Sequence, residues 1–397
     1  MSLKLKIDLK GWFLYVILIP FLYPRGFSEY IPAYKTFFTL WLYGAMICVF
    51  MTIIFEISNY RISLKPYNCW LILYFVIMIL LTLLVQKSFN EGLQKMFATP
   101  ALCILSAIYL RKEPKCFIRC VNNLLTVIFL LNLTIFSPLF WGQYFAPITN
   151  HITFLGHVQI STQLGIAGIF FAYLNYNLYS RSKKRLIFNI VLSVVTMISS
   201  FTSAAYISVI ALTILWLIRK LKIQLKIISK TQVCVYVYFL FNLFLFWFIT
   251  YKGVSLSVAG FSLNGRGHIW REALNSFLRN PVHGYGVHGV LIKVFWSAWT
   301  GDGQGMNYMH NQILQVLNDG GVILFIPYIF MIVSGIKNLN RLEKGQLQFW
   351  SMICMVITLF VMTFESAMEY FYVFLVFMAI SYLPEIYCGL KQSNWRQ

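Results

Sequence analysis

Charged residues are scarce in this chain. Lys, Arg, Asp and Glu together make up 11% of the 397 residues, whereas 59% are hydrophobic and the mean hydropathy is +0.71. A soluble domain carries roughly 25% charged residues, so the composition excludes a water-soluble fold. The alternating polar and apolar positions of a membrane-spanning β-barrel are also missing. The sequence therefore predicts an all-α polytopic membrane protein.

Acidic residues are the rarer charge type, with 12 Asp and Glu against 32 Lys and Arg, and the formal net charge is +20. In a soluble protein this excess would suggest a nucleic-acid partner. Here most of the basic residues lie in short segments beside apolar runs, where anionic headgroups attract them. We therefore expect membrane lipids as partners and no nucleic acid. A DxD-like acidic cluster that could hold a metal ion is also missing.

The eight cysteines indicate neither disulfides nor a metal site. All of them fall in predicted spans or in loops on the basic side of the membrane, which argues against a disulfide framework. Cys116 and Cys120 have neither a second cysteine pair nor a histidine nearby. The first apolar stretch lacks a small-residue cleavage site and contains Pro20 and Arg25, so we expect a retained span. No metal or other cofactor is predicted.

Long apolar runs recur along the whole chain. A helix of roughly 20 apolar residues can cross a hydrocarbon core of about 30 Å. The sequence predicts twelve such spans, at residues 12–24, 36–55, 68–86, 96–110, 119–138, 161–179, 186–201, 203–218, 232–251, 311–334, 348–364 and 370–388.

Twelve spans place every basic loop on one side of the membrane. That side holds 23 of the 32 Lys and Arg residues, so by the positive-inside rule it is cytoplasmic and contains both termini. Residues 186–218 could instead form one long helix, because only Ser199, Ser200, Thr202 and Ser203 mark a break. Two spans are favoured, since a single span would spread the basic loops over both sides.

One loop on the opposite side is far longer than the others. Residues 252–310 contain no predicted span, and a loop of this length is usually functional or disordered. The loop divides a single integral-membrane domain into spans one to nine at residues 1–251, the loop itself, and spans ten to twelve with a cytoplasmic tail at residues 311–397.

Within this loop, residues 271–279 have the periodicity of a short amphipathic helix. Asn280 and Pro281 end the predicted helix. Its apolar stripe consists of Trp270, Ala273, Leu274, Phe277 and Leu278, and the glycines of the turn beyond it are Gly284, Gly286 and Gly289.

All six histidines fall on the non-cytoplasmic side of this topology. His310 differs from the others because it immediately precedes the tenth span, where Asn311, Gln315 and Asn318 form a polar stripe. Such a stripe is unfavourable in lipid, so we expect it to face protein or a cavity. A histidine there can take a proton from a hydroxyl group, since imidazole has an unperturbed pKa of about 6.5. Histidines merely tolerated in wet loops are the alternative.

Three arginines of the loop, Arg266, Arg271 and Arg279, lie where the positive-inside rule disfavours them. Guanidinium groups bind phosphate bidentately, so a lipid-linked diphosphate is the predicted ligand. A cationic clamp on a leaving diphosphate would also replace a metal ion. Pairing with Glu272 or Asp302 is the alternative interpretation.

Acidic residues are almost absent from the predicted late spans. Asp319, Glu365 and Glu369 are among the few acidic residues in or near these spans. We expect Glu365 and Glu369 to lie close to the non-cytoplasmic surface, where ionisation costs little.

The order of four short motifs resembles that of the O-antigen polymerase and O-antigen ligase superfamily. The motifs are Asn-Gly-Arg-Gly-His-Ile-Trp at 264–270, Asn-Pro-Val-His-Gly-Tyr-Gly at 280–286, His-Asn at 310–311 and Gly-Gly at 320–321. They cover residues 264 to about 330, and the rest of the chain is similar by topology alone. The resemblance implies a bacterial inner-membrane protein of about twelve spans with a large periplasmic loop.

The resemblance also implies an activity, that of a metal-independent glycosyltransferase acting on undecaprenyl-diphosphate-linked glycans at the periplasmic face. His310 matches the family histidine before the tenth span, which would be the base for the acceptor hydroxyl. Arg266 matches the loop arginine that would hold the donor diphosphate. A chain-length regulator protein is a further implied partner.

Two positions depart from the family pattern. Where members often carry an arginine, Thr202 and Ser203 are followed by Ala204 and Ala205. Leu324 stands three positions after Gly321, where ligases tend to have a small residue or Tyr. Both departures favour a polymerase. Arg271 and Arg279 are the candidates to replace the missing arginine.

The sequence is compatible with three functions. A polymerase would transfer a growing glycan from its lipid diphosphate to a lipid-linked repeat unit, and a ligase would transfer finished O-antigen to lipid A-core. A polysaccharide flippase or secondary transporter is less favoured, because such proteins often carry internal repeats and none is visible here.

Overall fold

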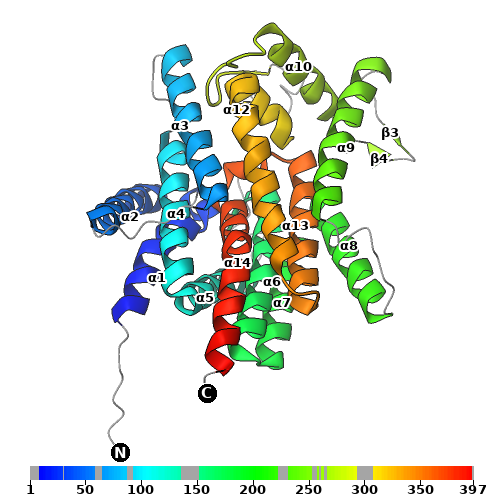
Figure 1. The fold of residues 1–397 in the computed structure, drawn as a ribbon. Coiled ribbons are helices and arrows are strands. Elements are labelled where there is room, and N and C mark those ends of the chain that lie inside the picture. Colours follow the sequence, from blue (N-terminus) through cyan, green and yellow to red (C-terminus); the bar gives the residue numbers. More distant parts are fainter. Residues whose placement is uncertain are drawn as a thin grey trace, which may run out of the picture.

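The computed structural model describes residues 9–29, 31–58, 65–86, 93–135, 152–221, 231–252, 257–258, 261–262, 266–292 and 307–395. Within these ranges the chain is predominantly helical, and long helices packed side by side form the body of the molecule (Figure 1). The predicted all-α class is confirmed. The strands form two antiparallel hairpins, β1 (Ile152–Thr153) with β2 (Gly156–His157) and β3 (Ser257–Val258) with β4 (Phe261–Ser262).

The α-helices follow one another along the chain with few long connections among the described residues. They are α1 (Leu9–Leu22), α2 (Pro32–Ser58), α3 (Pro66–Gln86), α4 (Leu93–Lys112), α5 (Pro114–Leu133), α6 (Val158–Asn175), α7 (Lys183–Ile198), α8 (Ser203–Lys220), α9 (Thr231–Lys252), α10 (Arg266–Arg279), α12 (Gln312–Lys337), α13 (Gln346–Phe364) and α14 (Phe371–Trp395). Shorter helical segments are η1 (Arg25–Glu29), η2 (Tyr176–Ser180), η3 (Asn338–Arg341) and η4 (Ala367–Glu369).

Each predicted span overlaps one of these helices. In the described part of the chain, 8 helices are long and apolar enough to cross a membrane. A multi-pass membrane protein is therefore confirmed, whereas the count of twelve spans and the orientation of the termini stay predictions. Large apolar side chains are exposed at the periphery, for example Leu84 (73%), Leu240 (64%) and Phe50 (60%). Such side chains are stable in contact with lipid tails.

The α7–α8 junction is a true break, as predicted. At the end of α7, the Ser199 hydroxyl donates a hydrogen bond to the Thr196 carbonyl at 3.0 Å, and the Ser200 hydroxyl donates one to the Met197 carbonyl at 2.7 Å. Thr202 then caps α8, because its Oγ1 accepts a hydrogen bond from the amide of Ala205 at 3.3 Å. Two helices therefore replace the single long helix that the apolar run also allowed.

The centre of the bundle is formed by α6, in which every residue from Ile160 to Asn175 is buried. It packs against α5, α7, α13 and α14, while α12 packs against α3 and α14. The C-terminus lies at the end of the bundle opposite α10 (Figure 1). The start of α12 lies at the α10 end, because α10 packs against α12, and the first turn of α6 lies there too, because Gln159 contacts His310 just before α12.

The loop helix α10 covers that end of the bundle, in contact with α9 and α12 (Figure 1). It begins at Arg266, five residues before the predicted start at residue 271, and ends at Arg279 as predicted. Trp270 and Ala273 of the predicted stripe are buried, whereas Leu278 is 63% exposed and does not belong to it. The earlier start follows from the burial of Gly267, Ile269 and Trp270 against the bundle.

Candidate active site

Four side chains meet where α6, α10, α12 and α13 come together. Arg266 begins α10, His310 lies two residues before α12, Glu365 directly follows α13, and Gln159 lies in the first turn of α6. The structure therefore joins the two predicted residues, Arg266 and His310, through a carboxylate that the sequence did not assign to the site.

Glu365 is the centre of this cluster. Its Oε1 accepts a hydrogen bond from Arg266 Nη2 at 2.5 Å, and its Oε2 lies 3.1 Å from His310 Nδ1. The Glu365 side chain is 1% exposed, against 19% for Arg266 and 15% for His310. The expectation that ionisation costs little at Glu365 is therefore wrong. A buried carboxylate is unfavourable unless it is paired, and the Arg266 guanidinium provides the opposite charge.

The partner of Arg266 also differs from the predicted ones. Glu272 is exposed on α10 and forms no recorded contact with Arg266, and Asp302 lies outside the described residues. Among the described residues, the Arg266 guanidinium has its hydrogen bond at Nη2. The remaining N–H groups of this partly exposed side chain can therefore bind another acceptor.

The contact with Glu365 selects one tautomer of His310. A carboxylate only accepts hydrogen bonds, so the 3.1 Å contact requires the proton on Nδ1. Gln159 Nε2 also lies 3.3 Å from Nδ1 and would fit the opposite tautomer. The charged acceptor gives the stronger hydrogen bond, so Nδ1 carries the proton. The lone pair of Nε2 is then left to act as a base.

The backbone of His310 is held in an uncommon conformation. Its φ angle is 50°, in the left-handed region that residues with a side chain rarely adopt. Trp270 Nε1 donates a hydrogen bond to the His310 carbonyl at 3.2 Å, and the Tyr308 ring lies edge-on to the imidazole with 4.7 Å between centroids. These contacts fix the direction of the imidazole, and strain of this kind is frequent at functional sites.

Two tyrosines complete the surroundings of the carboxylate. Tyr308 donates a hydrogen bond from its hydroxyl to Glu365 Oε2 at 3.3 Å, and burial, followed by the Glu365 charge, raises the Tyr308 pKa well above its usual value. Burial also raises the pKa of Tyr370 to about 12, a rise that Arg25 opposes and Glu365 increases. The Tyr308 phenol is therefore a neutral donor at physiological pH, and Arg25 lies near enough to influence Tyr370.

The predicted polar stripe of α12 faces protein. Asn311 caps the helix by accepting the Leu314 amide at 3.0 Å, and its Nδ2 donates to Asn242 Oδ1 at 2.7 Å. The Gln315 Oε1 accepts the Met309 amide at 3.0 Å. Asn318 Nδ2 donates to the Ala273 carbonyl of α10 at 3.0 Å. Asn311, Gln315 and Asn318 thus hold the segment around His310 and α10 in place.

A break in α12 receives the loop that follows α10. Gly321 has a φ of 60° and a ψ of −158°, which interrupts the helical hydrogen bonds. The amides of Val322 and Ile323 donate instead to the carbonyls of Pro281 and Val282 at 2.9 and 3.2 Å. This backbone pairing explains the spacing of the Asn-Pro and Gly-Gly motifs: it fixes α10 against α12.

Arg271 and Arg279 are not part of the cluster. Both are exposed on α10, with no recorded ion-pair partner among the described residues. Arg25, in η1, is a better placed cation, since it lies near Tyr370 and its Cζ is 5.3 Å from the centroid of the Phe371 ring. The sequence offered one signal for Arg25, a cation directly after the first apolar run on the side that disfavours cations.

The position of the missing family arginine lies close to this site. Thr202 Oγ1 is 3.1 Å from Ser200 Oγ and 3.5 Å from Thr162 Oγ1. Thr162 is one helical turn along α6 from Gln159, which contacts His310. The α7–α8 junction therefore presents hydroxyl groups near the site where the family pattern has a cation.

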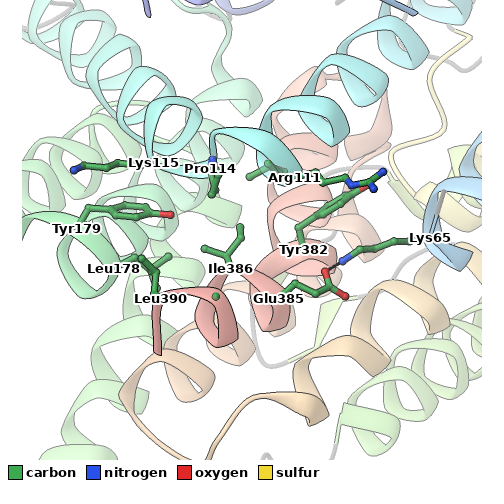
Figure 2. A pocket seen from close by; sticks show the side chains of 12 residues that line it. Lys65, Arg111, Pro114, Lys115, Leu178, Tyr179, Tyr382, Glu385, Ile386 and Leu390 are labelled. Atoms are coloured by element: carbon green, nitrogen blue, oxygen red, sulfur yellow. Dashed lines mark ion pairs between the residues drawn. The ribbon is translucent and has the colours of Figure 1, made fainter. Parts of the chain in front are cut away.

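A cavity of about 660 Å³ lies at the other end of the bundle, lined by the N-terminal end of α3, the α4–α5 connection and α14. Figure 2 shows the side chains of Lys65 and Glu385, both of which line the cavity, meeting each other in an ion pair. Lys65 Nζ also donates to the Ser381 carbonyl at 3.2 Å and lies 4.0 Å from the centroid of the Tyr382 ring. This lysine therefore ties α3 to α14, and the cavity is separate from the His310 cluster.

Residues 188–329 match the family model described as O-Antigen ligase. The matched segment runs from α7 to α12 and includes Arg266 and His310, whereas Gln159 and Glu365 lie outside it. A search of curated proteins found no match to the chain. The family match covers about a third of the chain and agrees with the motifs and the helical membrane fold, so it supports the similarity to the O-antigen polymerase and ligase superfamily.

Proposed function

We propose that the protein is a polymerase of O-antigen or of a related surface polysaccharide, in the inner membrane of a bacterium. It transfers a growing glycan from undecaprenyl diphosphate to a lipid-linked repeat unit at the periplasmic face. The observation that supports this proposal is the buried Glu365 carboxylate between Arg266 and His310. It combines a cation suited to a diphosphate leaving group with a base suited to a sugar hydroxyl.

In the proposed transfer, His310 Nε2 takes the proton of the acceptor hydroxyl while the hydroxyl oxygen attacks the anomeric carbon of the donor. The bond between that carbon and the diphosphate oxygen breaks, and its electron pair leaves with undecaprenyl diphosphate. Glu365 holds the proton on His310 Nδ1 and stabilises the imidazolium that forms. Arg266 binds the leaving diphosphate through the guanidinium N–H groups that Glu365 leaves free.

A diphosphate carries more than one negative charge, so a second cation would stabilise the leaving group further. Arg25 is our candidate, in place of the exposed Arg271 and Arg279, because it lies on the Tyr370 side of the cluster. Two guanidinium groups would neutralise charge that other glycosyltransferases balance with a metal ion.

The ligase activity is the second candidate, and the description of the matching family model favours it. The chemistry at His310, Glu365 and Arg266 would be the same, with lipid A-core in place of a lipid-linked repeat unit as the acceptor. Leu324 is buried in α12 behind the break at Gly321, at the position where ligases tend to have a small residue or Tyr, and we take this difference as support for the polymerase.

The lipopolysaccharide ladder of a deletion strain distinguishes the two activities. Loss of a polymerase leaves a single repeat unit on the core, whereas loss of a ligase leaves bare core and accumulated lipid-linked polymer. We expect the first pattern, with restoration of the full ladder by the wild-type gene. Bare core with lipid-linked polymer would show a ligase, and repeat units retained on the cytoplasmic leaflet would contradict both.

A further inference from the structure

A second large hollow in the described part of the protein lies away from the His310 cluster, on the surface of the bundle. It is a groove of about 830 Å³ between α6, α7, α8 and α13. Lining residues recur on one face of α7, at Leu186, Ile190 and Val194, and on one face of α8, at Val209, Leu212 and Trp216. The walls are therefore apolar along the length of two neighbouring helices.

The groove has the depth of one lipid leaflet. The α7 lining runs from Lys183 to Val194 and the α8 lining from Lys220 to Val209. At about 1.5 Å per residue, each helix lines the groove over roughly 16 Å. Half of a hydrocarbon core of about 30 Å is roughly 15 Å. An extended acyl chain from one leaflet fits this length.

All the charge in the groove is positive and lies at one end. Because a short junction connects α7 and α8 at residues 199–202, the start of α7 and the end of α8 lie together, and they carry Lys183, Arg219 and Lys220. The three side chains are exposed, and none of the described residues that line the groove is acidic. Trp216 lies among them, with Lys220 Nζ 5.2 Å from the centroid of its ring. Tryptophan is enriched where lipid headgroups meet the hydrocarbon core.

The cavity in Figure 2 provides a contrast within the same molecule. It too is lined by cations, but Glu385 lies within it and pairs with Lys65. The groove between α7 and α8 has no such internal partner. Its cations are therefore available to an external anion, and its walls are suited to hydrocarbon.

We propose that this groove binds an anionic phospholipid of the leaflet on the Lys- and Arg-rich side of the membrane. The headgroup phosphate lies among Lys183, Arg219 and Lys220, and one acyl chain lies along α7 and α8 toward Val194 and Val209. Cationic pockets between membrane helices bind acidic lipid headgroups by this combination of charge and apolar surface. The site is independent of the transfer reaction proposed for the His310 cluster.

The test uses the full-length protein, purified in detergent and titrated with dioleoyl-phosphatidylglycerol or with dioleoyl-phosphatidylcholine, and bound lipid is counted by native mass spectrometry. We expect the wild type to bind the anionic lipid about tenfold more tightly than the zwitterionic one. The variant Lys183→Ala, Arg219→Ala, Lys220→Ala should lose this preference. The matched control, Arg119→Ala, Lys184→Ala, Lys337→Ala, removes three exposed cations outside the groove and should keep it.

A third variant tests the apolar walls of the groove without changing its charge. Ile190→Trp fills the groove and should weaken binding of both lipids several-fold. Equal preference for phosphatidylglycerol in the triple variant and in its control would overturn the proposal. So would a wild-type protein that binds both lipids equally, or one whose groove retains a polyprenyl phosphate that phosphatidylglycerol cannot displace. Loss of a wild-type dimer in the triple variant would show that a second copy of the chain, not lipid, covers the groove.

Discussion

Single residues determine the chemistry of this site through their protonation states and directions. Glu365 accepts hydrogen bonds from Arg266 and Tyr308 and lies against His310 Nδ1, so it meets three potential donors in a nearly dry environment. Such an arrangement is stable only while the carboxylate is ionised and its partners keep their protons. The same carboxylate sets the tautomer of His310 and holds one edge of the Arg266 guanidinium.

We predict that His310→Ala and Arg266→Ala each abolish the polysaccharide ladder in cells. Loss of a general base typically costs roughly 10²-fold to 10⁴-fold in rate, and loss of the arginine leaves a buried carboxylate unpaired as well as the diphosphate. The measurement is the ladder together with the amount of protein in the membrane fraction. Arg271→Ala is the control, since Arg271 is exposed and outside the cluster. Wild-type polymer lengths in the two site variants would contradict the assignment.

Glu365→Gln tests the role of the charge separately from that of the shape. Glutamine has nearly the same size and can still accept a hydrogen bond, but it can neither stabilise an imidazolium nor pair with Arg266. We expect polymer formation to fall roughly 10²-fold or more, whereas Glu365→Asp, which keeps the charge, should retain part of it. Polymer yield per amount of membrane protein is the readout. If Glu365→Gln works as well as Glu365→Asp, the carboxylate has only a structural role.

The ends of three helices position the side chains of the site. His310 directly precedes Asn311, the residue that caps α12. Arg266 is the first residue of α10, and Glu365 is the first residue after the end of α13 at Phe364. Each of the three site side chains is thus placed by the end of a rigid helix. The break in α12 and its pairing with residues 281–286 then fix α10 relative to α12.

Gly321→Ala should disrupt this arrangement. A Cβ there would lie 2.3 Å from the Val282 carbonyl oxygen, and the φ of 60° with ψ of −158° is accessible essentially to glycine alone. We expect the free energy of unfolding to fall by about 1–3 kcal/mol, which would be seen as a lower melting temperature in detergent. Gly44→Ala is the control: Gly44 lies in α2 with nothing within 4 Å of the methyl group that alanine would add, so this change should be neutral or slightly stabilising. Equal melting temperatures for the two variants would contradict the role of Gly321.

The whole molecule separates two chemically different ends. The helix α10, which carries Arg266 of the His310 cluster, lies at one end of the bundle, and the C-terminus lies at the opposite end (Figure 1). Away from the cluster, Lys65 lines one cavity and Arg219 lines the groove between α7 and α8. The proposed transfer needs its site at the periplasmic surface, and by the positive-inside rule we expect the basic end of the bundle in the cytoplasm. The predicted orientation therefore rests on the same kind of charge that lines the groove between α7 and α8.

Labelling with a membrane-impermeant maleimide tests this orientation. In a background in which the exposed Cys69 and Cys388 are replaced by alanine, Leu278→Cys on α10 should react in intact spheroplasts. Lys344→Cys, which is exposed before α13, should react only after permeabilisation. The opposite pattern would place the His310 cluster in the cytoplasm and would contradict a periplasmic transfer reaction.

Local patterns in the sequence determined the helices and one half of the site. Apolar runs predicted the membrane helices, the break at residues 199–202 separated α7 from α8, and the position of His310 before a helix singled it out. These features depend on residues close together in the chain, because hydrogen bonding within a helix and partition into lipid are local properties.

The inclusion of Glu365 and Gln159 in the site, and the pairing of Arg266 with Glu365, were decided by tertiary packing. Arg266 and Glu365 are 99 residues apart, and Gln159 lies farther still from His310 along the chain. Nothing in their spacing indicates contact, and an acidic residue at a predicted span end is ordinarily assigned to water. Packing of α13 between α6 and α12 buries Glu365 and leaves Arg266 as its partner, because a carboxylate removed from water must find an opposite charge.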